Sequence, residues 1–441
     1  MLPLFLAASA LAADPAPTLS VPHERFTLDN GLEVILARDT SVPFVWVNVW
    51  YHVGSRDESP GRSGFAHLFE HLMFQGSEHA NDDYFKPLQR VGAQINGTTN
   101  VDRTNYFEGV PREHLPLALW LESDRMGWLL PSLDEARLAN QKEVVRNERR
   151  QRYENVPYGL VWPTLLANVF PEGHPYHIAT IGKHEEIDAA TLDDVKGFFQ
   201  RWYLPNNAAL VVCGDFDPRT ARSLIAHYFD DVPAGPEPVP APAPAQVRFD
   251  GERVVVLNDE KAAFERVYMV WPSPALYAPG DAELDLLSDA LAGGKDGRLY
   301  RALVRDQQIA QDVSAYQQSM GLQSMYVVSA TVAAGHTGSE VLQAIDEVLA
   351  QAREKGVSDD EAAIAKTQYE LSFYGDLATI QGKADRLNGY WRAKGDPDWF
   401  AEDLARYTGA TAQTISEALR TWLPPDRRLV LTVQPPARGA E

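Results

Sequence analysis

A proline-rich stretch near the middle of the chain limits the possible folds more than any other sequence feature. Residues 233–247 contain six prolines separated by one or two residues, half of them alanine. Proline fixes φ and has no backbone N–H, so this stretch cannot form a helix or a central strand and is expected to be an extended spacer. The 441 residues therefore divide into two predicted domains, 20–232 and 248–441, each of ordinary domain size.

The N-terminal residues have the character of an export signal. Residues 1–13 are almost wholly apolar and end in Ala10-Leu11-Ala12, a small-x-small pattern that suits signal peptidase. No Lys or Arg precedes Arg25, which departs from the usual basic start, and a disordered apolar leader is the alternative. No later stretch approaches the roughly 20 apolar residues of a membrane-spanning helix. We therefore expect a signal peptide over residues 1–13 and a periplasmic protein without a membrane span.

The net charge limits the classes of molecule that the protein can be expected to bind. A formal charge of −21 at pH 7 argues against nucleic acids and anionic membranes, because binding phosphate groups requires clustered Lys and Arg side chains. The charge is compatible with basic peptide substrates, although solubility explains it equally well.

Strand and helix patterns alternate in a similar order on both sides of the spacer. The first half is predicted to contain strands at 25–28, 32–37, 44–51 and 208–213, and helices at 63–74, 111–128, 132–153 and 191–202. Asp29-Asn30-Gly31 joins the first two strands as a tight hairpin. The second half is predicted to contain strands at 253–257, 264–271 and 428–433 and a helix at 282–291, with further helices before the last strand. These patterns predict an α+β fold from an ancient duplication, with two unrelated α+β domains as the alternative.

The helix predicted at residues 63–74 carries the residues that indicate chemistry. Ser63 can cap its start and Gly76 can end it, so His67 and His71 lie one turn apart on one face, with Glu70 beside them. Two neutral imidazoles and a carboxylate suit Zn²⁺, which leaves its fourth position to a water that a nearby carboxylate can deprotonate. A chance coincidence of these residues is the alternative, and the apolar context of the helix argues against it.

A third protein ligand must come from elsewhere in the chain. The next long helix is predicted to open with a capping box from Ser132 to Glu135. It carries Gln141, Glu143 and Glu148 along its length. Spacing alone does not choose among these three.

The combination of motifs resembles the pitrilysin/insulinase metallopeptidases, whose His-x-x-Glu-His reverses the order of the thermolysin motif. Residues 140–151 resemble the second motif of that family, in which a further Glu follows the His-x-x-Glu-His motif by about 76 residues. Further matches occur at residues 92–100, 104–107, 174–176 and 204–215. The resemblance implies one zinc ion per chain, bound by His67, His71 and Glu148, with Glu70 as the catalytic base. Glu143 is then a solvated helix charge.

The resemblance also assigns supporting and substrate-binding residues. Members of the family bind a peptide as an added strand along a sheet edge. The segment with Asn96, Gly97 and Thr98 resembles the one that contacts the substrate backbone, although taken alone it reads as a polar turn. Gln141 stands where active relatives often carry a Glu that supports the metal site.

The second half departs from the family pattern. Residues 293–303 resemble a Gly-Gly-x-x-Ser-Arg-Leu-Tyr segment that normally leads to an Arg and, seven residues later, a Tyr that contact the substrate and stabilise the oxyanion. Val304 and Gln311 occupy those places here, and Arg305 lies one position away. In half-size members such as the beta subunit of mitochondrial processing peptidase, a homologue without the zinc motif supplies both side chains.

The sequence therefore predicts the catalytic subunit of a heterodimer that cleaves peptides or unfolded segments inside a closed chamber. The second domain, residues 248–441, carries no metal motif. The alternative is a non-catalytic assembly subunit of the same fold. The presence of all four site residues favours the peptidase.

Overall fold

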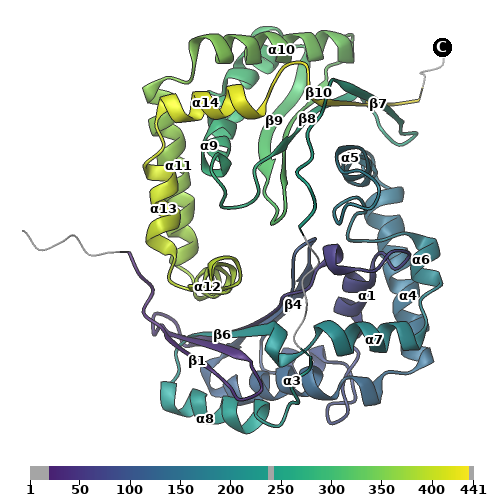
Figure 1. Ribbon diagram of the computed structural model, residues 1–441, viewed down its shortest axis with the longest axis vertical. Helices are drawn as coiled ribbons and strands as arrows, with labels where there is room; N and C mark the ends of the chain where they lie inside the picture. Colours follow the sequence, from purple (N-terminus) through teal and green to yellow (C-terminus); the bar gives the residue numbers. More distant parts are fainter. Residues whose placement is uncertain (1–18, 237–242, 437–441) are drawn as a thin grey trace, which may run out of the picture.

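The computed structural model describes residues 19–236 and 243–436 and contains two β-sheets, each covered by helices (Figure 1). The predicted leader, residues 1–13, lies outside the described residues, as does the centre of the proline-rich spacer. The described parts of the spacer, 233–236 and 243–247, form neither helix nor strand. Two mixed sheets packed with helices confirm the predicted α+β class with two domains.

The first sheet has six strands in the order β1-β2-β6-β3-β5-β4. Its strands are β1 (Glu24–Thr27), β2 (Glu33–Arg38), β3 (Phe44–Tyr51), β4 (Gln94–Thr99), β5 (Thr104–Pro111) and β6 (Ala208–Gly214). Strand β2 runs parallel to β6, and the other neighbours are antiparallel. The predicted hairpin between β1 and β2 is present, and Gly31 at its turn has a φ of 87°, a conformation that glycine adopts without strain. Strand β4 is left at the edge of the sheet.

The second sheet repeats this topology without an equivalent of β1. Its strands are β7 (Arg253–Asn258), β8 (Arg266–Ser273), β9 (Ala310–Gln318), β10 (Ser324–Val332) and β11 (Leu429–Gln434). Their order, β7-β11-β8-β10-β9, matches β2-β6-β3-β5-β4 strand for strand. The first pair, β7 and β11, is again parallel. This correspondence supports the duplication that the sequence predicted.

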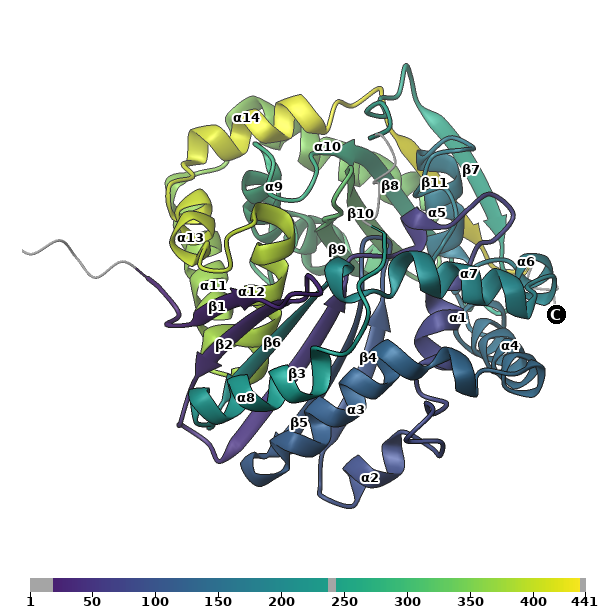
Figure 2. The ribbon, with the colours of Figure 1, turned by 60° about the horizontal axis from the view of Figure 1, so that its bottom comes forward.

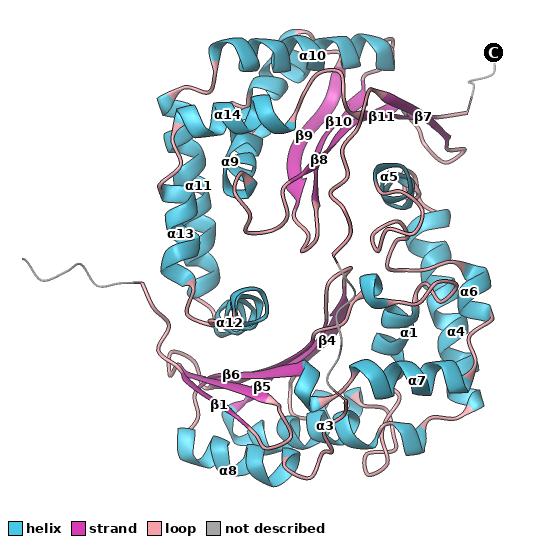
Figure 3. Cartoon of the chain, in the orientation of Figure 1, coloured by secondary structure: helices cyan, strands magenta, loops and turns pink. Residues whose placement is uncertain are grey.

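Helices cover both sheets (Figure 3). Those of the first half are α1 (Phe65–Leu72), α2 (Phe85–Gln89), α3 (Leu115–Trp128), α4 (Glu135–Arg149), α5 (Val161–Val169), α6 (His184–Asp188), α7 (Leu192–Trp202) and α8 (Pro218–Phe229). Those of the second half are α9 (Asp281–Ala292), α10 (Gly338–Lys355), α11 (Asp359–Leu377), α12 (Ile380–Lys394), α13 (Phe400–Thr408) and α14 (Ala412–Trp422). Within the described residues, no helix combines the length and apolarity needed to cross a bilayer.

The two halves exchange one helix each. Helix α12, from the second half, packs on β3 and β6 of the first sheet, whereas α5, from the first half, packs on β8 and β11 of the second (Figure 2). The face under α12 is apolar: Trp46 and Cys213 of the sheet share a buried cluster with Leu387 and Tyr390 of the helix. The exchange buries a face of each sheet that its own half leaves uncovered.

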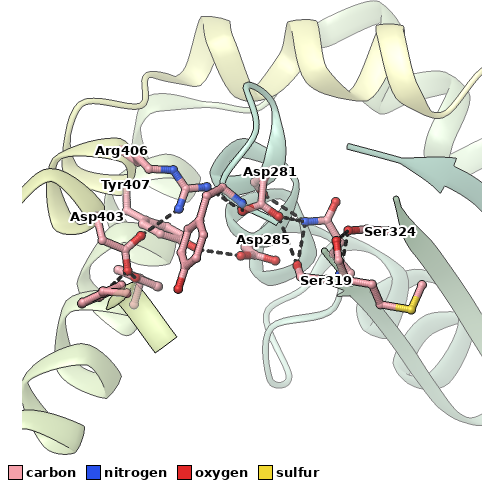
Figure 4. A network of polar contacts seen from close by, with 12 residues as sticks. Asp281, Asp285, Ser319, Ser324, Asp403, Arg406 and Tyr407 are labelled. Atoms are coloured by element: carbon pink, nitrogen blue, oxygen red, sulfur yellow. Dashed lines mark hydrogen bonds and ion pairs between the residues drawn. The ribbon is translucent and has the colours of Figure 1, made fainter. Parts of the chain in front are cut away.

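A buried polar network holds α13 against α9 in the second half (Figure 4). Asp281, fully buried at the start of α9, pairs with Nη2 of Arg406 at 2.5 Å, and Nη1 of the same guanidinium bonds Asp403 at 2.7 Å. One turn along α9, Asp285 accepts a 2.7 Å hydrogen bond from the Tyr407 hydroxyl. Burial raises the pKa of Asp285 to about 7, and the charge of Asp281 adds to the effect.

Candidate metal centre

The helix that carries the two histidines begins differently from the prediction. Gly64 precedes α1 with a φ of 87°, and the Ser63 side chain does not cap the helix but accepts the Lys183 N–H at 3.1 Å. The carboxylate of Glu58 binds the free backbone N–H groups of Gly64 and Ala66 at 3.0 and 2.9 Å. The left-handed Gly64 turns Ser63 away from the helix, which ends at Leu72 rather than at the predicted residue 74. A carboxylate six residues before Gly64 thus caps the helix in place of Ser63.

Helix α4 also starts later than predicted. Asp134 caps it by accepting the Arg137 N–H at 2.8 Å, whereas Ser132 donates its hydroxyl to the Gly76 carbonyl at 3.0 Å. The predicted capping box from Ser132 to Glu135 is therefore wrong, because Asp134 offers an acceptor two residues closer to the helix. Helix α4 continues from Arg149 into a π-helical segment, Arg150–Glu154, instead of running unbroken to residue 153.

Helix α1 lies between β4 and α4, and this packing brings the three predicted ligands together. His67 and His71 point their Nε2 atoms at one oxygen of Glu148, Oε2, at 3.7 and 3.1 Å. The ligand atoms of all three side chains lie within 4.8 Å of one another. Among residues 19–236 and 243–436, this is the one group of three or more His, Cys, Asp or Glu side chains that gathers in this way.

The geometry and protonation of this group fit a zinc ion. Ligand atoms at the zinc distance of about 2.0–2.1 Å in a tetrahedron are about 3.4 Å apart, which is close to the observed 3.1 and 3.7 Å. Burial lowers the pKa of His67 to about 4, helped by the neighbouring His71, so its ring is neutral at pH 7. A hydrogen bond from His71 and the nearby His67 lower the pKa of Glu148. Neutral imidazole and ionised carboxylate are the forms that bind metal.

Glu70 stands beside the three ligands but does not join them. Its Oε2 accepts a 2.5 Å hydrogen bond from the Thr99 hydroxyl, and burial raises its pKa above the ordinary value. The raised pKa brings Glu70 nearer to the range of a group that both takes up and releases a proton at neutral pH. Glu70, the three ligands, Phe74 and Arg152 are among the residues that line one cavity of about 440 Å³.

The predicted substrate strand borders the same cavity. Asn96, Gly97 and Thr98 lie on β4, the edge strand, and line the cavity together with Gln141. A Cβ atom at Gly97 would lie 3.0 Å from the Phe74 ring and 3.2 Å from Cγ of Glu70, so a larger residue here would crowd the Glu70 side chain. Gln141 is 5% exposed and donates to the Asn140 side chain at 3.0 Å.

The second-half residues that depart from the family pattern do not line the cavity at the histidines. Val304 packs against the core of the second half, and the amide of Gln311 donates to the Val332 carbonyl at 3.1 Å. Arg305 pairs with Asp306 at 2.7 Å and lines a separate cavity with Lys355. That cavity shares no residue with the one at the histidines.

Sequence reasoning missed three residues that contact the site. Glu58 caps α1, Thr99 holds Glu70, and Nη1 of Arg152 binds Oε1 of Glu148 at 2.8 Å. The spacing of Arg152, four residues after Glu148, is a signal that could have identified it. Thr99 gives no such local signal, because its contact with Glu70 comes from tertiary packing. Glu58 precedes Gly64 by six residues, outside the usual capping positions.

Comparisons with known proteins find two family models and a set of relatives. Residues 33–179 match the insulinase family model (peptidase family M16), and residues 189–369 match the model described as the peptidase M16 inactive domain. The chain is 30% identical over 378 residues to the zinc protease PqqE of Helicobacter pylori, covering 83% of each protein.

Two solved structures share the fold. A protease from Helicobacter pylori superposes with a TM-score of 0.88 at 25% identity, over 95% of this chain and 100% of that one. The first half of the periplasmic protease PqqL from Escherichia coli gives 0.77 at 17% identity, over 95% and 93%; at that identity the likeness concerns the fold alone. From its two family matches, its relative and its fold, the chain belongs to the M16, or pitrilysin/insulinase, peptidase family as a half-size member.

Proposed function

We propose that the protein is a zinc-dependent endopeptidase, and the observation that carries the proposal is the convergence of His67, His71 and Glu148 beside the buried Glu70. Two imidazole nitrogens and one carboxylate oxygen make the ligand set of a catalytic zinc site with an open position. When bound there, zinc supplies Lewis-acid polarisation of a water and of the scissile carbonyl. The relatives described as zinc proteases support the same ion.

Within this site Glu70 acts as the base. Its carboxylate takes the proton of the attacking water and then passes it to the leaving amine, which requires a group that changes protonation state during the cycle. Thr99 keeps one carboxylate oxygen in place by its hydrogen bond. Gln141, whose amide bonds the Asn140 side chain, lines the wall of the cavity and contributes no charge to the metal site.

The substrate binds as an additional strand along β4. The Asn100 N–H donates to the Arg103 carbonyl at 3.0 Å, and antiparallel hydrogen-bonded pairs alternate along the ladder. Counting back from this pair, the backbone groups of Gly97 turn away from β5 towards the open edge. The Gly97 N–H meets only the adjacent Asn96 side chain, at 2.9 Å, a contact that an incoming peptide can replace.

A partner subunit completes the oxyanion site. Val304 has no donor group and Gln311 is engaged with its own sheet, so a homologue without the zinc motif would supply the Arg and Tyr, forming a heterodimer whose closed chamber admits peptides and unfolded segments. We place this pair in the periplasm, from the apolar leader predicted at residues 1–13.

A non-catalytic assembly subunit is the second candidate. The match of residues 189–369 to a domain described as inactive favours it, but that match lies outside the segment carrying His67, His71, Glu70 and Glu148.

Metal analysis and peptide cleavage test the proposal. The purified chain is expected to bind one zinc, and with its homologous partner to cleave an unstructured peptide until a chelator is added. Glu70→Gln should retain zinc and lose about 10²–10⁴-fold in kcat. Glu143→Gln, on an exposed side chain that pairs only with Arg146 and Arg150, should keep full activity. Zinc-free protein, or cleavage that survives chelation, contradicts the proposal, and full activity of the chain without the partner contradicts the heterodimer.

A further inference from the structure

The two oxygens of the Glu148 carboxylate have different neighbours. Oε2 faces the two histidine rings, at 3.1 Å from His71 and 3.7 Å from His67. Oε1 accepts a hydrogen bond from Nη1 of Arg152 at 2.8 Å. The side chain of Glu148 is 16% exposed and that of Arg152 is 73% exposed. The arginine therefore reaches the buried ligand from the solvent side of the cavity that both residues line.

The backbone brings Arg152 to this position at the point where helix α4 ends. Arg150–Glu154 is π-helical, and the wider turn lets Arg149 meet Glu154, five residues on, at 2.9 Å. Single π turns inside helices occur frequently at functional sites. Arg149 also donates to the Gly182 carbonyl, and His184 binds Glu154 at 2.8 Å. The contacts of Arg149 and Glu154 thus hold the first and last residues around the turn that carries Arg152 in place.

Arg149, the last residue of α4, and the two arginines of the π-helical turn each have their own partner. Arg149 pairs with Glu154, as described, and Arg150 bonds the Asn147 side chain at 2.7 Å and Glu143 at 3.4 Å. Only Arg152 pairs with Glu148. The contact is therefore specific to one position of a basic run, and its neighbour Arg150 offers a matched comparison.

We propose that Arg152 is a positioning residue for the metal centre, whose guanidinium holds Oε1 of Glu148 so that Oε2 alone faces the metal. A carboxylate without this contact can rotate and present either oxygen or both, so the ligand set loses a fixed geometry. Partners of metal ligands typically change metal affinity 10- to 100-fold. Arg152 is largely exposed, which places its effect at the lower end, about tenfold. The inference rests on the zinc site proposed above.

Zinc affinity of three variants tests the inference. Arg152→Met keeps most of the side-chain length and removes the charge, Arg152→Lys keeps the charge, and Arg150→Met removes a charge two residues away. Competition with a chromophoric chelator gives the zinc dissociation constant, and thermal unfolding of the zinc-free proteins shows whether each variant folds. We expect about tenfold weaker zinc binding for Arg152→Met, partial recovery for Arg152→Lys, and wild-type affinity for Arg150→Met.

The possible outcomes separate the two proposals. Because an exposed ion pair adds little to folding stability, the zinc-free Arg152→Met protein should unfold at nearly the wild-type temperature. Equal zinc affinity of Arg152→Met and the wild type, or equal weakening by Arg150→Met, overturns the role of Arg152 while the zinc site stands. A wild-type chain that binds no zinc overturns the zinc site itself.

Discussion

Replacing Asp285 by Asn should stabilise the protein in alkaline buffer but not in acid. Asp285 has a folded-state pKa of about 7 against an ordinary 3.8, so the folded chain holds this proton more tightly than the unfolded chain. Its contribution to stability is complete below about pH 4 and is lost as the pH rises through 7. About three pKa units correspond to a loss of at most about 4 kcal/mol, and partial exposure of the side chain reduces the expected value to about 2 kcal/mol.

The substitution removes this loss and keeps the network. The Asn amide oxygen can still accept the hydrogen bond that Tyr407 donates to Asp285 at 2.7 Å. Urea unfolding at pH 5 and pH 8 measures the difference: Asp285→Asn should exceed the wild type by about 2 kcal/mol at pH 8 and by less than about 1 kcal/mol at pH 5, where only part of the loss has occurred. Asp296→Asn, on an exposed carboxylate, is the control and should leave the pH dependence unchanged. A variant with the same pH dependence as the wild type refutes the reasoning.

Two further substitutions examine the surroundings of the site. Gly97→Ala places a Cβ 3.0 Å from the Phe74 ring and 3.2 Å from Glu70, so these side chains or β4 must move by a few tenths of an ångström; we expect kcat/KM to fall about tenfold with little change in melting temperature. Gly375→Ala, where a Cβ meets nothing within 4 Å, is its control, and equal activity of both contradicts the close-approach argument. Arg125→Met removes the cation that pairs with the fully buried carboxylates of Glu108 and Glu122. The substitution should lower the free energy of unfolding in urea by about 3–5 kcal/mol. A cost below about 1 kcal/mol would show that the two carboxylates are already neutral.

The sequence predicted the parts of the site that depend on local spacing. His67, Glu70 and His71 fall on one helix, and their relation follows from 3.6 residues per turn. Glu148 required the family resemblance, because Gln141 and Glu143 satisfy the same helical pattern. In the structure, Glu148 is the one of these three residues whose side chain lies close to both histidine rings.

Contacts made by tertiary packing could not be predicted in this way. The cap of α1 comes from Glu58, not from the local Ser63, because a left-handed glycine lies between Ser63 and the helix. The order of elements predicted two similar halves, but nothing in the sequence of α12 shows that it covers the first sheet. An apolar helix face is complementary to many apolar surfaces, and only the assembled fold determines which one it meets.

The exchange of α5 and α12 has a consequence for synthesis of the chain. The sheet face around Trp46 and Cys213 is completed by Leu387 and Tyr390, which leave the ribosome long after the last strand of that sheet. The first half therefore cannot finish folding while the chain is being made, and a product truncated before α12 would expose this apolar face to aggregation. Residues late in the chain thus complete the structural support of a site whose four residues all lie before residue 150.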